Sequence, residues 1–195
     1  MFDSFENVSY KELTHPDAIM QLGGADPATF DAVIFYDMPR DIKDEEKIVF
    51  RKLVKDGKGL LFLHHSICSY QDWNDYKSYT GGKYYEKMKD EAFGVSTYRH
   101  DVKFRIQILE KSHPITRGVK DFEILDEVYG NLEVLPGVQP LLATNHPLSN
   151  KIIGWTFQKE NSRVVYIEPG HDKNAYSNPS YQQLIRQAII FAAGR

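Results

Sequence analysis

The stretch GLLFLHHSICSY, residues 59–70, is typical of a buried strand that ends on two adjacent histidines, His64 and His65. Two patterns come before it. DAVIFYDMP at 31–39 is a continuous apolar run that a proline ends. DEEKIVFRKLVKDG at 44–57 has helical spacing, with acidic residues in its first turn and a glycine near its end. A strand, a helix and a strand of these lengths predict a parallel βαβ unit.

Further strand patterns follow this unit. KFRIQILE at 103–110 alternates polar and apolar residues, as a half-exposed strand does, and QPLLATN, KIIGWTF and SRVVYIE predict three more strands. The chain closes on NPSYQQLIRQAIIFAAG, a helix that Asn178 can cap and Pro179 can begin. We therefore expect one domain over residues 1–195, with an open α/β sheet and helices on both faces.

The composition is that of an ordinary globular protein, with 42 % hydrophobic and 26 % charged residues. The net charge of −3 provides no basic surface for nucleic acid or a membrane, and no apolar run is long enough to cross a bilayer. Nothing at the N-terminus resembles a signal peptide, and the single cysteine, Cys68, excludes an internal disulfide. We expect a cytoplasmic protein without nucleic-acid or membrane partners, and the 13 % aromatic content is compatible with a homo-oligomer.

The two histidines at the end of the predicted strand are the first candidates for chemistry. In an open α/β sheet, ligands bind outside the carboxyl ends of the strands, and His64 and His65 lie at such an end. Because side chains alternate along a strand, we expect only one of the two to face a pocket. The alternative is that one histidine is a hydrogen-bonded core residue and the other is exposed.

Three other segments combine imidazole and carboxylate groups near predicted strand ends. TYRHDVK holds His100 before a strand, ILDEVYG holds Asp126 and Glu127 after a short apolar run, and VVYIEPGHDKNAY holds His171 and Asp172 after a strand. Such groups supply metal ligands or a general acid–base pair, and no helical ligand spacing decides between the two. The plainer interpretation of Asp126 and Glu127 is a solvated loop start.

Cys68 follows a predicted strand and therefore raises the question of a nucleophile. The turn HHSICSY lacks the glycines of a strained nucleophile elbow, and Cys68 lies beyond the strand end. We interpret it as a small buried residue. Ser66 could act as an activated hydroxyl, but the G-x-S-x-G pattern is absent.

Taken in order, these segments resemble the ThuA-like (trehalose utilisation) family, a branch of the class I glutamine amidotransferase-like superfamily. The matching pieces are DAVIFYDMP, GKGLLFLHHSICSYQDWNDYKSYTGGKY, HPITRGVKDFEILDEVYGN and SRVVYIEPGHDKNAYSNPSYQQLIRQAIIFAAG, which cover nearly the whole chain in the family's order. The resemblance implies a flavodoxin-like, mostly parallel sheet, a lost catalytic cysteine, and a role in carbohydrate metabolism, often beside sugar oxidoreductases that make keto-sugars. The family's recurrent polar positions correspond to His64, His65, Trp73, Gly81, Gly82, His100, Asp126, Glu127, Tyr129, His171 and Asp172.

The chain departs from the family at its beginning. Family members usually open with a strand and a glycine–histidine turn, whereas this chain opens with MFDSFENVSYKELTHPD, which looks like the end of the first helix. That first strand would be central in a flavodoxin-like sheet, and its loss would expose unpaired backbone. We therefore expect Met1 to be internal, or another element or chain to fill the gap; an upstream segment could also carry a signal peptide.

The hypothesis from sequence is an enzyme that acts on a small-molecule sugar or keto-sugar. A proton moved next to a carbonyl, or a glycosidic bond cleaved after oxidation, would suit the predicted groups. We expect Glu127 and His171 to be the acid–base pair. The remaining roles are substrate contact by His65, Trp73, Tyr129 and Asp172, and ligation of a divalent metal such as zinc by His64 and His100.

Two other functions remain open at the level of sequence. The same pocket could bind a sugar or an anion without turnover, as a module that serves a sugar-oxidation pathway. A glutamine amidotransferase is the third reading, and it requires a reactive thiol at Cys68.

Overall fold

The structure is a computed structural model that describes residues 1–91 and 93–195. It contains a seven-stranded sheet in the order β1-β2-β9-β8-β7-β4-β5 and a two-stranded sheet of β3 and β6. The helices and 3-10 helices are η1 (Phe2–Ser4), α1 (Ala18–Gly24), η2 (Pro27–Thr29), α2 (Asp44–Lys55), η3 (His64–Cys68), η4 (Asn74–Tyr76), α3 (Lys77–Thr80), α4 (Lys173–Tyr176) and α5 (Pro179–Ala192). The strands are β1 (Ala32–Phe35), β2 (Gly59–Leu63), β3 (Gly82–Lys83), β4 (Thr97–Ile108), β5 (Phe122–Gly130), β6 (Glu133–Val134), β7 (Gln139–Ala143), β8 (Ile152–Lys159) and β9 (Ser162–Ile167).

The predicted βαβ unit is confirmed by β1, α2 and β2. The strands β1 and β2 are parallel, with Ala32 opposite Gly59, and α2 connects them. At the start of α2 the Glu46 carboxylate accepts a hydrogen bond from the Lys43 backbone N–H at 2.9 Å, which satisfies a free donor of the first turn. At the other end of the chain, the Asn178 side chain accepts from the first N–H groups of α5, as its sequence predicts.

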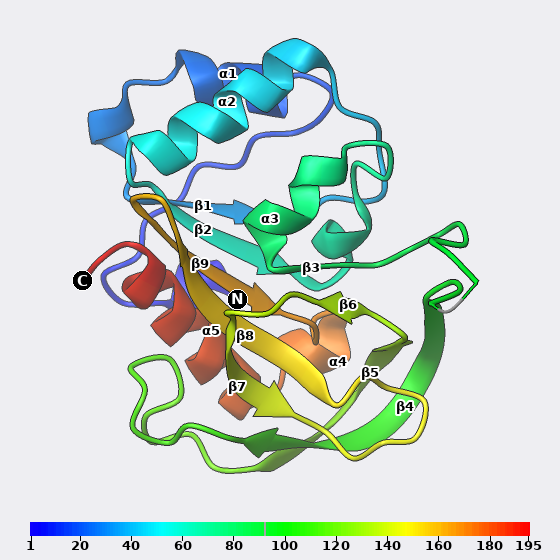
Figure 1. The fold of residues 1–195 in the computed structure, drawn as a ribbon. Helices are drawn as coiled ribbons and strands as arrows, with labels where there is room; N and C mark the ends of the chain where they lie inside the picture. The colour runs from blue at the N-terminus through cyan, green and yellow to red at the C-terminus, as the bar shows by residue number, and fades with distance from the viewer. Residues whose placement is uncertain (92) are drawn as a thin grey trace.

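The prediction of a mostly parallel sheet is wrong, because the sheet is mixed. Among the described strands, only the pairs β1–β2 and β2–β9 of this sheet are parallel, whereas the pairs from β9 through β8, β7 and β4 to β5 are antiparallel. The reason lies in the connections. Lys159 pairs with Ser162, so only two residues join β8 to β9, and a link this short can join only antiparallel strands. The antiparallel half curls away from the parallel half in Figure 1.

Helices cover both faces of the parallel half, as predicted. Leu61 and Leu63 of β2 pack in one hydrophobic cluster with α5, whereas Leu60 and Phe62 pack in a second cluster with α2. This division follows from the alternation of side chains along a strand. Both faces of β2 are therefore buried, which accounts for its continuous apolar sequence. Figure 1 shows α2 and α5 on opposite sides of the sheet.

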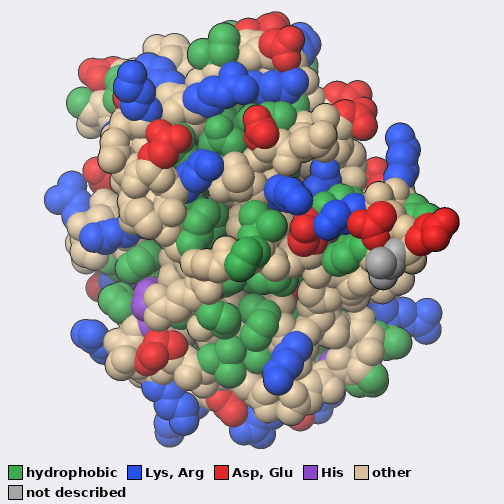
Figure 2. Space-filling view, in the orientation of Figure 1, with side chains coloured by type: hydrophobic (Ala, Val, Ile, Leu, Met, Phe, Trp, Pro, Cys, Tyr) green, Lys and Arg blue, Asp and Glu red, His purple; other side chains and the backbone are tan. Residues whose placement is uncertain are grey.

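The strands β1 and β2 pair directly, so the sheet formed by the described residues has no gap between them. The expectation of a further strand upstream of Met1 stays a prediction. Among the described residues, no helix combines the length and the apolar composition that a membrane span requires. Acidic and basic side chains surround a centre of hydrophobic side chains on the face shown in Figure 2.

Glu133 on β6 holds a small cluster of charges beside the second sheet. Its carboxylate accepts hydrogen bonds from Lys77, Lys89 and the Tyr85 hydroxyl. Burial acts to raise the pKa of Glu133, but the bonds from Lys89, Tyr85 and Lys77 outweigh burial and lower the pKa to about 2. A depressed carboxyl pKa contributes stability above the unfolded value of 4.5, and this contribution is lost as the pH falls toward 2.

We therefore expect Glu133→Gln to destabilise the fold at neutral pH, by about 1 kcal/mol for a partly exposed ion-pair network. The difference from the wild type should shrink as the pH falls from 4.5 toward 2, because the wild-type carboxylate is then protonated as well. Urea unfolding of both proteins across this range measures it. A difference independent of pH would show that the charge of Glu133 contributes nothing.

Candidate functional site

His64 lies directly after β2, at the carboxyl end of the parallel half. It begins the 3-10 helix η3, so the prediction that His64 and His65 alternate along a strand is wrong. His64 has a left-handed backbone, with φ of 50°, which is strained for a residue with a side chain and is frequent at functional sites. Its ring is fully buried, and Nδ1 donates to the Glu168 carbonyl oxygen at 2.8 Å. Because a carbonyl only accepts, this bond places a proton on Nδ1 and leaves Nε2 free for the site.

Glu127 lies in the middle of β5 and not at the start of a loop, so the solvated-loop interpretation is wrong. Both Asp126 and Glu127 are buried. Oε2 of Glu127 lies 2.9 Å from His64 Nε2 and 3.3 Å from His171 Nδ1, and Oε1 lies 3.2 Å from His100 Nδ1. Burial acts to raise the pKa of Glu127, but the three histidines outweigh burial and lower it. Glu127 is therefore a carboxylate that three imidazoles surround.

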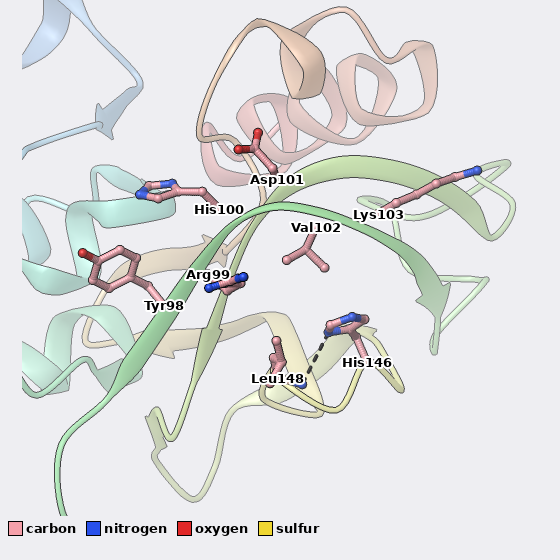
Figure 3. Close-up of a pocket in the computed structure, with 8 residues that line it drawn as sticks. All are labelled: Tyr98, Arg99, His100, Asp101, Val102, Lys103, His146 and Leu148. Atoms are coloured by element: carbon pink, nitrogen blue, oxygen red, sulfur yellow. Dashed lines mark hydrogen bonds between the residues drawn. The ribbon is translucent and has the colours of Figure 1, made fainter.

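A β-bulge directs His100 toward Glu127. Arg99 pairs with Val128 and Val102 pairs with Asp126, so two residues of β4, His100 and Asp101, lie opposite Glu127 alone. Asp101 takes a left-handed backbone with φ of 57°. His100 was predicted just before a strand, whereas β4 begins three residues earlier and includes it. In Figure 3, β4 bends through this stretch and Asp101 lies at the bend.

The bulge can be tested by substitutions at Asp101, which leave the imidazoles of His64, His100 and His171 unchanged. Asp101→Gly is expected to hold or raise stability, because glycine adopts a positive φ without a steric penalty. Asp101→Val should lower stability by about 1–2 kcal/mol, since a β-branched residue is strained there. Thermal unfolding of the two variants measures the difference. If both variants unfold at the same temperature, the left-handed backbone at this position is not a constraint.

The turn before His171 is fixed by Gly170 and by Asp126. Gly170 has φ of 135°, and an added Cβ would collide with the Tyr181 hydroxyl, so only glycine fits. The Asp126 carboxylate accepts from the Gly170 N–H at 2.6 Å and from the His171 N–H at 3.0 Å. Burial is the main influence on the pKa of Asp126 and raises it, although His64 and the backbone N–H groups oppose this effect. Asp126 thus attaches the His171 backbone to β5.

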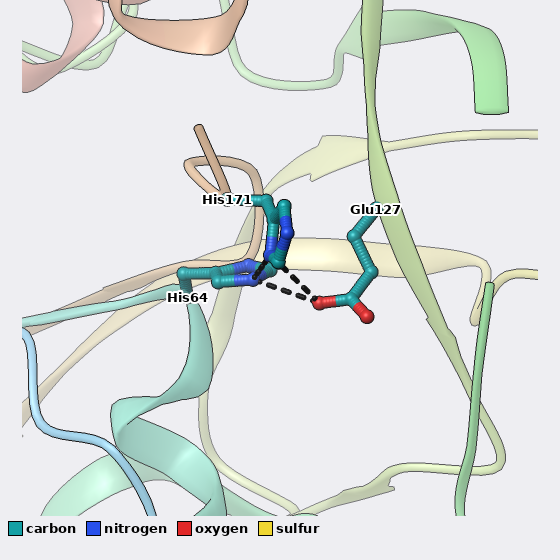
Figure 4. A group of neighbouring side chains, drawn as sticks. All are labelled: His64, Glu127 and His171. Carbon is teal, nitrogen blue, oxygen red and sulfur yellow. Dashed lines mark hydrogen bonds and ion pairs between the residues drawn. The ribbon is translucent and has the colours of Figure 1, made fainter. Parts of the chain in front are cut away.

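Three ligand-type atoms converge where these elements meet. His64 Nε2 and His171 Nδ1 are 3.1 Å apart, and the Glu127 Oε2 atom completes a triangle with them. Figure 4 shows the two imidazoles and the carboxylate facing one another. Among the described residues, these three form a group whose geometry could hold a metal ion. We call His64, His100, Glu127 and His171 the histidine–glutamate cluster. His100 and His171 are partly exposed, with side-chain exposures of 51 % and 38 %, so the cluster is open to solvent.

The predicted substrate contacts are placed very differently. Tyr129 stacks on His64 with ring centroids 5.0 Å apart, and its hydroxyl lies 3.1 Å from His64 Nε2. Tyr129 is buried, so it supports the cluster and offers no free ring face. The ring of Trp73 is buried against Phe50, Tyr76 and Tyr79, so it offers no free face to a sugar. Asp172 accepts from the Asn174 N–H at 2.7 Å and caps α4.

His65 lies beside the cluster together with Tyr36, a tyrosine that the sequence patterns did not indicate. Nδ1 of His65 donates to the Asp37 carbonyl at 2.7 Å, and burial, followed by the nearby His64, lowers the pKa of His65. The Tyr36 ring lies 4.4 Å from His65, and its hydroxyl donates to the Gly170 carbonyl at 2.9 Å. Tyr36 is 41 % exposed. The sequence signal for Tyr36 was its position directly after β1, the strand that pairs with β2.

Cys68 is buried in η3, as expected from the sequence. Burial is the main reason why the pKa of its thiol is raised, so the thiolate is disfavoured at neutral pH. An open hollow of about 740 Å³ lies along β4 beside the cluster and is lined by residues that include Tyr98, His100 and His146 (Figure 3). His100 therefore lines this hollow and also contacts Glu127.

Comparisons with known proteins agree with these observations. The sequence model of the ThuA family, described as trehalose utilisation, matches residues 8–192. A ThuA-like protein of Parabacteroides merdae superposes with a TM-score of 0.70 at 15 % identity, covering 88 % of this chain and 74 % of that one. A cytoplasmic protein of Salmonella typhimurium superposes with a TM-score of 0.62 at 15 % identity, covering 92 % and 76 %. None of the curated proteins compared with the chain matches it.

Proposed function

The chain belongs to the ThuA family of trehalose utilisation, and from this premise we propose that it is an enzyme that acts on a sugar or keto-sugar at the histidine–glutamate cluster. The observation that carries the proposal is the position of Glu127. One buried carboxylate contacts three imidazoles at 2.9–3.3 Å, at the carboxyl ends of β2 and β9. Ionisable groups that gather around a buried carboxylate and also reach solvent are candidates for a functional site.

The cluster is suited to moving protons to and from a substrate. His171 is partly exposed and contacts Glu127, so the two can act as the acid–base pair that the sequence predicts. His64 is fully buried and donates to a backbone carbonyl, which supports a role in orienting its neighbours. Proton transfer at a carbon next to a carbonyl, as in a keto-sugar, is the reaction class that these groups serve best.

Recognition of a sugar ring is best supported at Tyr36 and His65. Sugars bind to proteins through aromatic faces and hydrogen bonds, and the exposed ring of Tyr36 lies beside His65. Nε2 of His65 remains able to accept a hydroxyl hydrogen bond, since Nδ1 carries the proton. Tyr36→Ala should therefore weaken sugar binding more than Tyr36→Phe, which keeps the ring.

The second candidate is a module that binds the sugar without turnover, in support of a sugar-oxidation pathway. The open cluster is consistent with such a module, because binding alone requires only Tyr36, His65 and the polar groups of the cluster. A glutamine amidotransferase is disfavoured, because the only cysteine is buried and its thiol pKa is raised. In either candidate the partner is a small carbohydrate, and we propose a cytoplasmic location.

A turnover screen separates the candidates. The purified chain is incubated with trehalose, other disaccharides and their keto derivatives, and products are followed by mass spectrometry and NMR. Product formation that His171→Ala removes and Cys68→Ser retains supports the enzyme. A saturable thermal shift with one of these sugars and no product supports the binding module. Full activity in His171→Ala would contradict the role of His171, and loss of sugar turnover in a folded Cys68→Ser protein would contradict the structural role of Cys68.

A further inference from the structure

We propose that His64, Glu127 and His171 form a binding site for one divalent transition-metal ion, with zinc as the first choice. The sequence alone suggested His64 and His100 as ligands. In the structure, however, His100 Nδ1 contacts the outer oxygen of Glu127, whereas the converging atoms are His64 Nε2, His171 Nδ1 and Glu127 Oε2. The metal site deepens the proposed function. Its role toward a sugar substrate rests on that function, whereas the coordination of the ion does not.

The spacing of the three atoms fits a tetrahedral ion. Zinc lies 2.0–2.2 Å from nitrogen and oxygen ligands, which places neighbouring ligands of a tetrahedron about 3.3 Å apart. The three observed distances are 2.9, 3.1 and 3.3 Å, close to the edge of such a tetrahedron. Two histidines and one glutamate are also a known catalytic zinc set, which leaves the fourth position for a substrate or water.

The surroundings of the ligands have the features of a metal site. A ligating histidine usually donates its other ring N–H to a carbonyl or carboxylate, and His64 Nδ1 donates to the Glu168 carbonyl. Oε1 of Glu127 is held by His100, and the His171 backbone is held by Asp126. Each of the three ligands is therefore oriented by a separate contact.

A network held by protons alone explains the contacts around His64 Nε2 less well. The Glu127 carboxylate, His171 Nδ1 and the Tyr129 hydroxyl all lie within 3.1 Å of this one nitrogen. Since Nδ1 carries the proton, Nε2 can accept from the Tyr129 hydroxyl or from a His171 N–H, but a carboxylate oxygen at 2.9 Å is a second acceptor with no proton between the two atoms. A divalent cation would satisfy both nitrogens and the carboxylate together.

The ion would redistribute the roles within the cluster. When bound, it would polarise a carbonyl or hydroxyl oxygen of the sugar as a Lewis acid. Glu127 and His171 would then be ligands and not a free acid–base pair. His100, half-exposed and in contact with the second oxygen of Glu127, would be left to carry the proton.

The test is zinc binding by the full chain, measured without any substrate. Protein purified without chelators is analysed for metals, and chelator-treated protein is titrated with Zn²⁺ by calorimetry, with Mn²⁺ and Co²⁺ as further probes. We expect about one ion per chain. His171→Ala and Glu127→Gln should each weaken Zn²⁺ binding by about a hundredfold or more, because the loss of a ligand exceeds the 10–100-fold effect of an outer contact.

Two variants serve as controls. His100→Ala should weaken binding by about tenfold or less, as an outer contact does. His146→Ala, at a half-buried histidine outside the cluster, should bind Zn²⁺ like the wild type. Circular dichroism confirms that each variant is folded. If folded wild type binds none of the three ions, or if both ligand variants bind Zn²⁺ unchanged, the site is refuted.

The outcome also separates this proposal from the proposed function. Zn²⁺ binding without turnover of any sugar would keep the metal site and remove the enzyme. Turnover by chelator-treated protein would keep the enzyme, with Glu127 and His171 as its acid–base pair, and would remove the metal from the reaction.

Discussion

Glu127→Gln is expected to lower sugar turnover by about a thousandfold while the fold is retained, within the range observed when an acid–base group is removed. Glutamine has the same shape, but it carries no charge and presents an NH2 group to one of its imidazole neighbours. The contacts at 2.9, 3.2 and 3.3 Å all lose their anionic acceptor. The change therefore affects either use of the cluster, as a proton-transfer pair or as a metal site.

The matched control for this prediction is Glu123→Gln. Glu123 lies on the same strand, β5, but its side chain is exposed and forms an ion pair with Lys103 at 2.9 Å. Turnover in Glu123→Gln should equal that of the wild type. Imidazole nitrogen NMR gives a second readout, because His64, His100 and His171 should all shift in Glu127→Gln. Wild-type turnover in a folded Glu127→Gln protein would remove the cluster from the chemistry.

Asp126→Ala is expected to destabilise the protein by about 3 kcal/mol, because three backbone N–H groups lose their buried acceptor. These are the N–H groups of Gly170, His171 and Glu127, bonded to the carboxylate at 2.6, 3.0 and 2.9 Å. The turn that carries His171 should then move away from β5. We therefore expect weaker Zn²⁺ binding and lower turnover in addition to the loss of stability, and we assign Asp126 a positioning role.

Urea unfolding of two companion variants makes the Asp126 prediction specific. Asp126→Asn keeps one acceptor oxygen and should lose about half as much stability. Asp121→Ala removes a more exposed carboxylate that accepts from the Ile108 N–H, and should cost about 1 kcal/mol. If Asp126→Ala unfolds at the same urea concentration as the wild type, the turn is held by other contacts.

The parallel half of the fold could be predicted because its signals are local. Continuous apolar runs identified β1 and β2, and the apolar spacing and end residues identified α2 and α5. The strand pairing of the antiparallel half could not be predicted in the same way. The strand patterns of β7, β8 and β9 were recognised, but the antiparallel pairing of β8 with β9 follows from the two-residue link after Lys159, which was not interpreted as a hairpin.

The candidate residues were predictable, but their arrangement was not. His64, His100, Glu127 and His171 were all selected from sequence, because histidines and carboxylates near strand ends are candidates for chemistry. The bulge at Asp101, which aligns two residues with Glu127, has no glycine to reveal it. Trp73 was selected as a sugar contact but is buried, and Tyr36 was not selected but is exposed, because the local sequence did not distinguish a buried ring from an exposed one.

The position of β9 has a consequence for synthesis of the chain. β9 is the last of the described strands to leave the ribosome, yet it lies between β2 and β8 and joins the two halves of the sheet. Until residue 167 emerges, the nascent β2 has an unpaired edge, and His64 is separated from Glu127 by strands that are not yet joined. Contacts of such long sequence separation form late. The nascent protein therefore acquires its complete cluster only after β9 and the turn that carries His171 have emerged, and a chain that stops before β9 has no means of assembling it.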